Sequence, residues 1–250
     1  MLIGEPPRTQ GDLNFPLFGF PVRVHPFFWL IVLFLGMSSP DVISLVVWMV
    51  AVFVSILFHE LGHAFAMRTY GLRPSITLYG FGGLTSPNYG GFHSARQPSP
   101  LGNVLISAAG PGAGFLLAAV VSGVVYLSGH ELRVSVGWPY GILVSPAEII
   151  YSMPMTMLVG QLLFINLLWG LVNLLPVYPL DGGHIVREIL VAANPRQGIA
   201  QSLIVSMFTA GALAIVGVVQ WHSLFVGLLF GYMAYTSFTT LQAYTGRGPW

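Results

Sequence analysis

The chain lacks cysteine and lysine altogether, and charged residues make up only 7% of it. Without cysteine, disulfide bonds and thiolate-bound zinc are excluded, so a metal site would have to use His, Asp or Glu. The formal net charge of +1 and the lack of a basic cluster give no support for a nucleic-acid partner. Soluble domains carry about 25% charged residues, so this composition is far from theirs.

Hydrophobic residues make up 55% of the chain and the mean hydropathy is +0.78, values typical of a polytopic membrane protein. The sequence contains five apolar runs long enough to cross a bilayer and a sixth, shorter one at residues 27–37. The five long runs cover residues 42–67, 101–127, 155–177, 202–219 and 224–241. We therefore predict an all-α polytopic fold with about six transmembrane helices and both termini on one side.

The Ser-Ser-Pro-Asp sequence at residues 38–41 predicts a tight turn between the first two spans. In this arrangement only Arg133 lies on the side opposite the termini, and by the positive-inside rule the other side is cytoplasmic. The arginines on the predicted cytoplasmic side are Arg8, Arg23, Arg68, Arg73, Arg96, Arg187, Arg196 and Arg247. We expect an integral protein of the cell (inner or plasma) membrane with both termini toward the cytoplasm.

The most informative motif is His59-Glu60-Leu61-Gly62-His63, an H-E-x-x-H run near the end of the span at residues 42–67. On a helix, residues four apart share a face, so His59 and His63 can bind one zinc ion with Glu60 beside it. Ionisable residues are costly in hydrocarbon and are usually functional there. The pattern predicts a metallopeptidase site inside a membrane, opening toward the cytoplasm. Two unrelated structural histidines are the alternative.

Catalytic zinc usually takes three protein ligands, and the best candidate for the third is Asp181. It follows an apolar span, in a segment interrupted by Pro176 and Pro179 and continued by Gly182 and Gly183. Irregular backbone at membrane depth is tolerated where it is buried or lines a cavity, so this segment can bend a carboxylate toward a metal. The alternative is a turn that ends one helix, with Asp181 as the N-cap of the next.

These motifs together resemble the site-2 protease family of intramembrane zinc metalloproteases. The matching pieces are the H-E-x-x-H run, the segment 173–183, the Gly-rich run 79–84, Ala109-Gly110-Pro111 and the entry at residues 18–25. They stand in the family's order and cover residues 18 to about 188. The resemblance is to compact members, without a PDZ domain between spans or a cystathionine-synthase-type (CBS) domain after them.

The resemblance implies that His59, His63 and Asp181 bind one zinc ion per chain and that Glu60 is the catalytic glutamate. Zinc chemistry supports the same roles, since the metal activates a water while a neighbouring carboxylate takes and returns its proton. Asn173 matches the family's asparagine near the active site. Its amide is expected to orient the substrate or stabilise the oxyanion, the alternative being a structural hydrogen bond between helices.

Residues 76–85 are too short and too glycine-rich for a spanning helix, and their alternation is strand-like. The resemblance implies a small membrane-embedded β element on which an unwound substrate adds as a further strand. A plain cytosolic loop is the alternative. Residues 128–150 are expected to form a mixed loop on the far side.

Two positions depart from the family's pattern. Gly114 stands where many members carry a polar or larger residue, and the Ala109–Gly114 run is interpreted as a helix-packing surface without chemistry. His184 stands where arginine is frequent, which indicates either a capping or solvated residue or a group next to the site. The remaining histidines have no partner at metal spacing and are interpreted as loop or interfacial residues: His25, His93, His130 and His222.

The domain organisation predicted is a cytosolic or interfacial lead-in at residues 1–25 that is not a signal peptide, one transmembrane metalloprotease domain at 26–245, and a tail at 246–250. The predicted function is hydrolysis of peptide bonds within or near transmembrane segments of membrane-tethered proteins, so the partners are such a substrate and the lipid bilayer. The alternatives are an inactive relative that binds transmembrane helices and a membrane metal transporter. Substrate identity, regulation and oligomeric state have no signal in the sequence.

Overall fold

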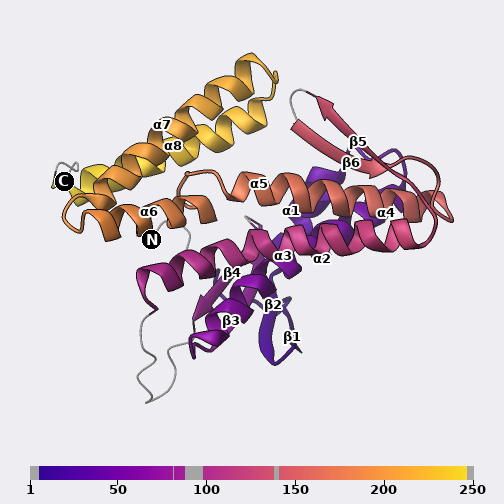
Figure 1. The fold of residues 1–250 in the computed structure, drawn as a ribbon, viewed down its shortest axis with the longest axis horizontal. Coiled ribbons are helices and arrows are strands. Elements are labelled where there is room, and N and C mark those ends of the chain that lie inside the picture. Colours follow the sequence, from indigo (N-terminus) through magenta and orange to yellow (C-terminus); the bar gives the residue numbers. More distant parts are fainter. Residues whose placement is uncertain (1–5, 81, 88–97, 138–140, 247–250) are drawn as a thin grey trace. The chain divides into compact units, whose positions relative to one another are not determined.

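The computed structural model describes residues 6–80, 82–87, 98–137 and 141–246, which form helices and two small sheets (Figure 1). Phe81, His93, Arg96 and Arg247 lie outside these residues. The chain divides into two units, the first made of Met1–Gln97 and Ala109–Gly170, the second of Pro98–Ala108 and Leu171–Trp250. Each unit is described by itself.

Within the described residues, five helical stretches are long and apolar enough to cross a membrane. They are α2 (Val42–Thr69), α3 (Pro100–Leu127), α4 with its continuation (Met153–Asn173), α7 (Gly198–Val219) and α8 (Leu224–Tyr244). The short run forms α1 (Pro26–Gly36), whose 11 residues span only about 16 Å. Because a hydrocarbon core is about 30 Å thick, α1 is too short to cross it as a helix, and a sixth span stays a prediction.

The third long stretch is not one uniform helix. It consists of α4 (Met153–Phe164), the π-helical segment η1 (Ile165–Trp169) and α5 (Gly170–Asn173). The predicted run continued to residue 177, but the helix ends earlier, at Asn173. Leu174 to Leu180 form turns instead, before α6 (Asp181–Ala193) begins.

The predicted turn at residues 38–41 is confirmed. Asp41 is the N-cap of α2, and its carboxylate accepts hydrogen bonds from the Ser44 N–H at 2.8 Å and the Ser44 hydroxyl at 2.9 Å. Such a cap satisfies donors that the first helical turn leaves unpaired. The start of α2 is therefore set locally by its own sequence.

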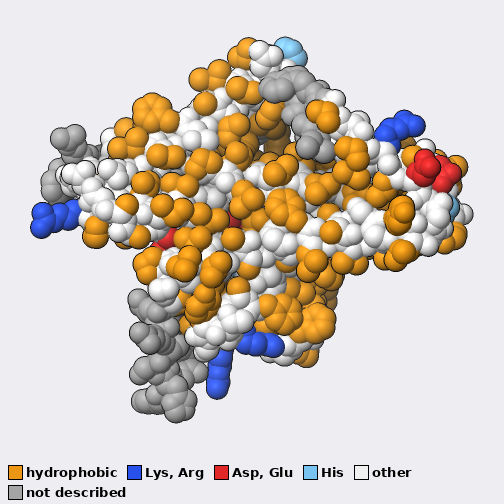
Figure 2. Space-filling model, in the orientation of Figure 1, with side chains coloured by type: hydrophobic (Ala, Val, Ile, Leu, Met, Phe, Trp, Pro, Cys, Tyr) orange, Lys and Arg blue, Asp and Glu red, His pale blue; other side chains and the backbone are white. Residues whose placement is uncertain are grey.

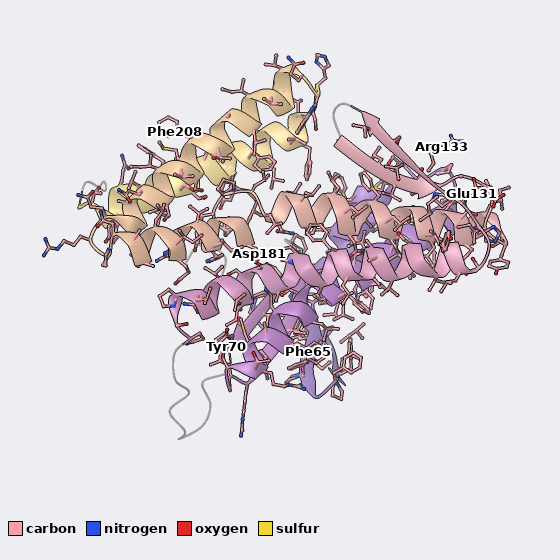
Figure 3. The ribbon with its side chains drawn as sticks, in the orientation of Figure 1. Phe65, Tyr70, Glu131, Arg133, Asp181 and Phe208 are labelled. Atoms are coloured by element: carbon pink, nitrogen blue, oxygen red, sulfur yellow. The ribbon has the colours of Figure 1, made fainter. Side chains whose placement is uncertain are left out.

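Large apolar side chains cover the outer surfaces of the long helices (Figure 2). Leu228 on α8 is 75% exposed and Phe208 on α7 is 68% exposed. Phe208 is labelled in Figure 3. So many exposed large apolar side chains are unusual on a water-soluble monomer. They fit helices whose outer faces contact lipid.

A four-stranded sheet packs against α2 in the first unit (Figure 1). Its order is β1 (Leu13–Leu17), β2 (Phe20–Val24), β3 (Pro74–Tyr79) and β4 (Gly82–Pro87). The neighbouring pairs are antiparallel, parallel and antiparallel in that order. The strand-like interpretation of residues 76–85 is confirmed, and the residues expected as a lead-in supply two further strands.

The alternation of buried side chains along β2 explains how this strand joins the sheet. Phe20, Val22 and Val24 are at most 2% exposed and pack with Ile76 and Leu78 in one core cluster against α2. Pro21 lies before the stretch that pairs with β3, which begins at Val22, so its missing N–H costs that ladder nothing. The buried Arg23 guanidinium is paired with Asp12 at 3.1 Å.

The far-side segment predicted as a loop contains the hairpin of β5 (Leu132–Gly137) and β6 (Gly141–Pro146). In the second unit α7 and α8 pack along each other and α6 packs on α7. The core of this unit is built around Val177, Ala210 and Phe230. Val177 belongs to the turn that precedes α6, so the irregular segment is itself part of the core.

Candidate metal centre

The two imidazoles of the H-E-x-x-H run meet on α2. Nε2 of His59 lies 3.1 Å from Nε2 of His63, and the ring centroids are 4.8 Å apart. Both residues are buried, at 9% and 8% exposure. Two nitrogens bound to one tetrahedral zinc ion at 2.0–2.1 Å would lie about 3.3 Å from each other. The helix alone thus brings the pair close to the separation that zinc requires.

Glycines let α3 approach these histidines. A Cβ at Gly62 would lie 2.2 Å from the Ala109 carbonyl oxygen, so α2 and α3 cross at backbone contact there. A Cβ at Gly110 would lie 2.2 Å from Nε2 of His63 and 2.7 Å from Nε2 of His59. Gly110 therefore leaves open the space in front of both nitrogens. The sequence interpretation assigned this run to packing alone and missed that second role.

Glu60 lies between α2 and β4. Its side chain is buried, with the residue 4% exposed, and the Thr85 hydroxyl donates a hydrogen bond of 2.6 Å to Oε2. A Cβ at Gly83 would lie 2.3 Å from Oε1. Burial, and secondly the charge of Glu60, raises the pKa of Tyr79 on the neighbouring strand β3. Thr85 was not predicted, because a single threonine 25 residues away carries no motif.

Asp181 is the first residue of α6 (Figure 3). The N-cap position belongs to Leu180, so the alternative that made Asp181 the cap is wrong by one residue. A Cβ at Gly182 would lie 2.2 Å from the Leu174 carbonyl oxygen, and one at Gly183 would lie 2.6 Å from the Tyr178 nitrogen. The two glycines therefore let the start of α6 pack directly on the turns before it.

A buried serine pair holds these turns in place. The Tyr178 N–H donates to Ser206 Oγ at 2.7 Å, and Ser206 Oγ lies 2.8 Å from Ser237 Oγ. Ser206 is 1% exposed and Ser237 is fully buried. The backbone three residues before Asp181 is thus tied to α7 and α8. No pattern in the sequence linked these two serines to the segment.

Asn173 ends α5 and is 7% exposed. Among the residues that the structure describes, its Nδ2 has no hydrogen-bond acceptor. Leaving a buried donor unpaired costs about 1–3 kcal/mol, so such groups are usually satisfied. The structural alternative, an interhelical bond donated by this amide, is not present among the described residues.

The structure brings two of the three predicted metal ligands, His59 and His63, together within the first unit, and it places Asp181 at the start of α6 in the second unit. Two imidazole nitrogens and a carboxylate oxygen form a donor set that suits catalytic zinc and leaves a fourth position open. With the space that Gly110 leaves before both Nε2 atoms, the residues present fit a bound zinc ion.

The other described histidines have separate roles. His25 caps α1 by accepting from the Phe27 N–H at 3.1 Å, and His130 pairs with Glu148 at 3.1 Å. His222 is exposed between α7 and α8. The ring of His184 lies 5.2 Å from that of Tyr178, at the turn before α6. This places His184 next to the Asp181 segment.

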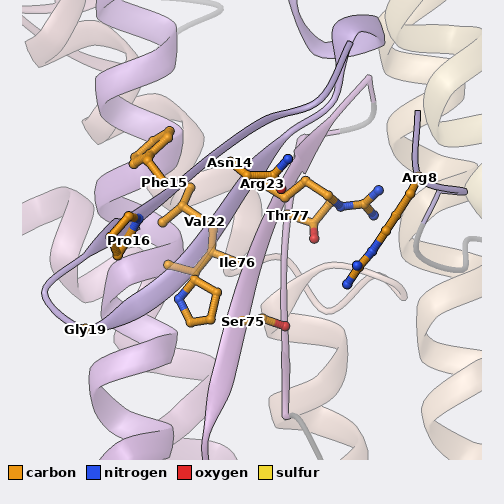
Figure 4. Close-up of a pocket in the computed structure, with 11 residues that line it drawn as sticks. Arg8, Asn14, Phe15, Pro16, Gly19, Val22, Arg23, Ser75, Ile76 and Thr77 are labelled. Atoms are coloured by element: carbon orange, nitrogen blue, oxygen red, sulfur yellow. The ribbon is translucent and has the colours of Figure 1, made fainter. Parts of the chain in front are cut away.

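The pocket drawn in Figure 4 lies over β1, β2 and β3 and does not include the candidate site. Arg8, Asn14 and Arg23 supply its polar lining together with Ser75 and Thr77. None of the residues predicted to bind metal or act in catalysis lines it.

Known proteins provide a comparison for this arrangement. The model of peptidase family M50 matches residues 47–218. A zinc metalloprotease of Methanocaldococcus jannaschii is 28% identical over 226 residues, covering 85% of this chain and 57% of that protein. The chain spans about half the length of the curated relatives it matches.

A solved structure, the site-2 protease from Methanocaldococcus jannaschii, is similar in fold. The TM-score is 0.56 with 21% sequence identity, and the match covers 90% of this chain and 93% of that one. The family match begins within α2 and continues past the end of α6, so it includes the candidate ligands and Glu60. The chain belongs to peptidase family M50, the site-2 protease family of membrane zinc metalloproteases.

Proposed function

We propose that this chain is a zinc endopeptidase that cuts peptide bonds within or near transmembrane segments of membrane-tethered proteins. One observation carries the proposal: Nε2 of His59 lies 3.1 Å from Nε2 of His63 on α2, and the residue next to His59 is the buried Glu60. The apolar faces of the long helices support a site within a membrane protein. The substrate would then be a peptide reached from the bilayer.

His59, His63 and Asp181 are the proposed ligands of one zinc ion. When bound, zinc would polarise the scissile carbonyl and make an adjacent water more acidic. Glu60 accepts the proton of the attacking water and later delivers it to the leaving amine. The Thr85 hydroxyl donates a 2.6 Å hydrogen bond to Oε2 of Glu60 and leaves Oε1 able to accept a proton.

Asn173 is the proposed donor to the substrate. Its buried Nδ2 has no acceptor among the described residues, so it can bind a peptide carbonyl without breaking an existing hydrogen bond there. A donor that meets the oxygen as its charge develops lowers the barrier, with typical effects of about 10²- to 10³-fold. We assign Asn173 to orienting the substrate or stabilising the oxyanion.

β4 is the proposed docking edge for the substrate backbone. Within the described sheet it pairs only with β3, which leaves its second edge for another strand. A transmembrane helix keeps its peptide bonds in internal hydrogen bonds, and the N–H and C=O groups freed by unwinding need new partners in lipid. Adding the substrate as a strand on β4 would supply them next to Glu60.

The excess of arginine on the side that bears the H-E-x-x-H end of α2 supports a site that faces the cytoplasm. Arg68 and Arg73 flank the C-terminal end of that helix, while Arg133 lies on the β5–β6 hairpin. We propose that both termini share the cytoplasmic side. A cysteine introduced at position 8 should therefore resist an impermeant thiol reagent applied to intact cells, and its labelling from outside would reverse the orientation.

The proposed chemistry is tested by Glu60→Gln in purified protein. The probe is a synthetic single-span peptide with a fluorophore and a quencher on either side of its apolar segment, in detergent micelles. We expect zinc content to be retained and cleavage to fall by about 10²- to 10⁴-fold, because the proton acceptor is lost. Glu131→Gln, at the exposed residue just before β5, is the matched control and should cleave normally. Wild-type turnover in Glu60→Gln would refute the mechanism.

A further inference from the structure

The helix that places the two histidines does not orient the carboxylate of Glu60. Successive residues on a helix are about 100° apart around its axis, so Glu60 leaves α2 in a different direction from His59. A glutamate side chain has several rotatable bonds and is mobile unless something holds it. General base catalysis needs that carboxylate at hydrogen-bond distance from the proton it takes. A second element must therefore fix it.

Strand β4 supplies that second element. The Thr85 hydroxyl donates to Glu60 Oε2 at 2.6 Å, within the range of strong O–H···O⁻ hydrogen bonds. The same hydroxyl lies 3.1 Å from the Glu60 carbonyl oxygen, so it contacts both the side chain and the backbone of this residue. Glu60 is 4% exposed, which limits competition from bulk water.

Gly83 completes the contact from the same face of the strand. Residues two apart on a strand point to the same side, so positions 83 and 85 both face α2. A Cβ at Gly83 would lie 2.3 Å from both Cγ and Oε1 of Glu60, so only glycine lets the carboxylate lie flat against the strand. The carboxylate is thus bounded on one oxygen by a hydroxyl and on the other by bare backbone.

We infer that Thr85 is a positioning residue for Glu60, an inference that rests on the proposed function. Its hydroxyl selects one orientation of the carboxylate by occupying a single lone pair of Oε2. Oε1 and the remaining lone pair of Oε2 stay able to accept a proton. Because β4 is also the proposed docking edge, the same strand would bind the substrate backbone and orient the carboxylate of Glu60.

The test compares three variants of the full chain with the single-span fluorogenic peptide. Thr85→Val keeps the shape of the side chain and removes its donor, whereas Thr85→Ser keeps the donor. Loss of a partner that orients a reacting group typically costs about 10- to 100-fold in activity. We expect Thr85→Val to lower kcat by this amount with KM and zinc content unchanged, and Thr85→Ser to recover most of it. Thr69→Val makes the same change on α2, where the hydroxyl only bonds its own helix, and should behave as wild type.

A second readout needs no cleavage. The chain has only 8 carboxylate side chains, so the infrared carboxylate band of Glu60 can be identified by its disappearance in Glu60→Gln. Removing the hydrogen bond should shift that band in Thr85→Val and leave it in place in Thr85→Ser and Thr69→Val. A wild-type kcat or an unshifted band in Thr85→Val would overturn the inference, as would a serine variant no better than valine. If wild type binds no zinc or cuts nothing, the proposed function fails. The infrared comparison would still show whether Thr85 donates a hydrogen bond to the Glu60 carboxylate.

Discussion

The two regions that supply the proposed ligands are built in opposite ways. α2 is a regular 28-residue helix, and its i, i+4 spacing alone brings two imidazole nitrogens to 3.1 Å. The turns before α6 have no regular periodicity, and the backbone near Asp181 depends on Ser206 and Ser237 from distant helices. A metal site can therefore combine a local component encoded by spacing with a component that exists only after tertiary packing.

The difference predicts where each region is vulnerable. On α2 the ligands need open space, so adding atoms should be harmful there. In the turns before α6 the backbone needs partners, so removing atoms should be harmful. The comparison would be wrong if added atoms were tolerated near the α2 histidines, or if removed atoms were tolerated at the turns before α6.

The largest effect after loss of Glu60 is expected from Gly110→Ala. Its Cβ would meet Nε2 of His63 at 2.2 Å, and overpacking of this kind costs about 1–3 kcal/mol, equivalent to about 10- to 100-fold in zinc affinity. The loss of zinc affinity is measured as the zinc content that remains after dialysis against increasing concentrations of a chelator. Gly112→Ala, two residues along α3, has nothing within 4 Å of the added atom and is the control. Equal zinc retention in both variants would show that zinc binding does not need the space that Gly110 leaves open.

A smaller effect is expected from Ser206→Ala in the second region. It leaves the half-buried Tyr178 N–H without its acceptor, which costs up to about 1–3 kcal/mol. We expect zinc affinity to fall by about tenfold because the Asp181 turn loosens. Ser202→Ala removes another buried hydroxyl from α7, one that bonds only the Ile199 carbonyl of its own helix, and should retain zinc. Matching losses in the two variants would mean that the serine pair does not hold the turn.

The smallest effect concerns the sheet that packs on α2. Hydrogen bonds from Thr9, and further the Arg23 guanidinium, lower the pKa of Asp12 from 3.8 to about 2. Because the folded pKa is depressed, the stabilisation is complete above pH 3.8 and is lost as the pH falls from there toward 2. Zinc-free protein should then show faster hydrogen exchange in β1 and β2, with α7 and α8 little changed. Asp12→Asn should lack this acid-dependent step, and an identical acid response in that variant would assign it to another group.

Regular features were predictable and tertiary ones were not. The five long spans, the turn before α2 and the H-E-x-x-H geometry follow from local periodicity and capping, and all are present in the described residues. β1 and β2 lie where the sequence predicts a lead-in, because they become strands only when β1 pairs with β2 and β2 pairs with the distant β3. The β5–β6 hairpin likewise lies where the sequence predicts a loop.

The site shows the same division. Asp181 could be named from its surroundings, since proline and glycine on both sides mark an irregular backbone. Thr85 and Ser206 could not, because isolated hydroxyl residues acquire a role only through the contacts that folding creates. Gly110 stood in a recognised run, but its position over the imidazoles depends on how α3 crosses α2.

The most direct test of a site assembled from both regions is zinc content per chain in detergent-purified protein, measured for wild type, His59→Ala and Asp181→Ala. A three-ligand site predicts about one zinc ion in wild type and loss in both variants, since removing one of three ligands lowers affinity steeply. Zinc that is absent from wild type, or retained in full by Asp181→Ala, would contradict the account, because the regular helix would then bind metal alone or not at all.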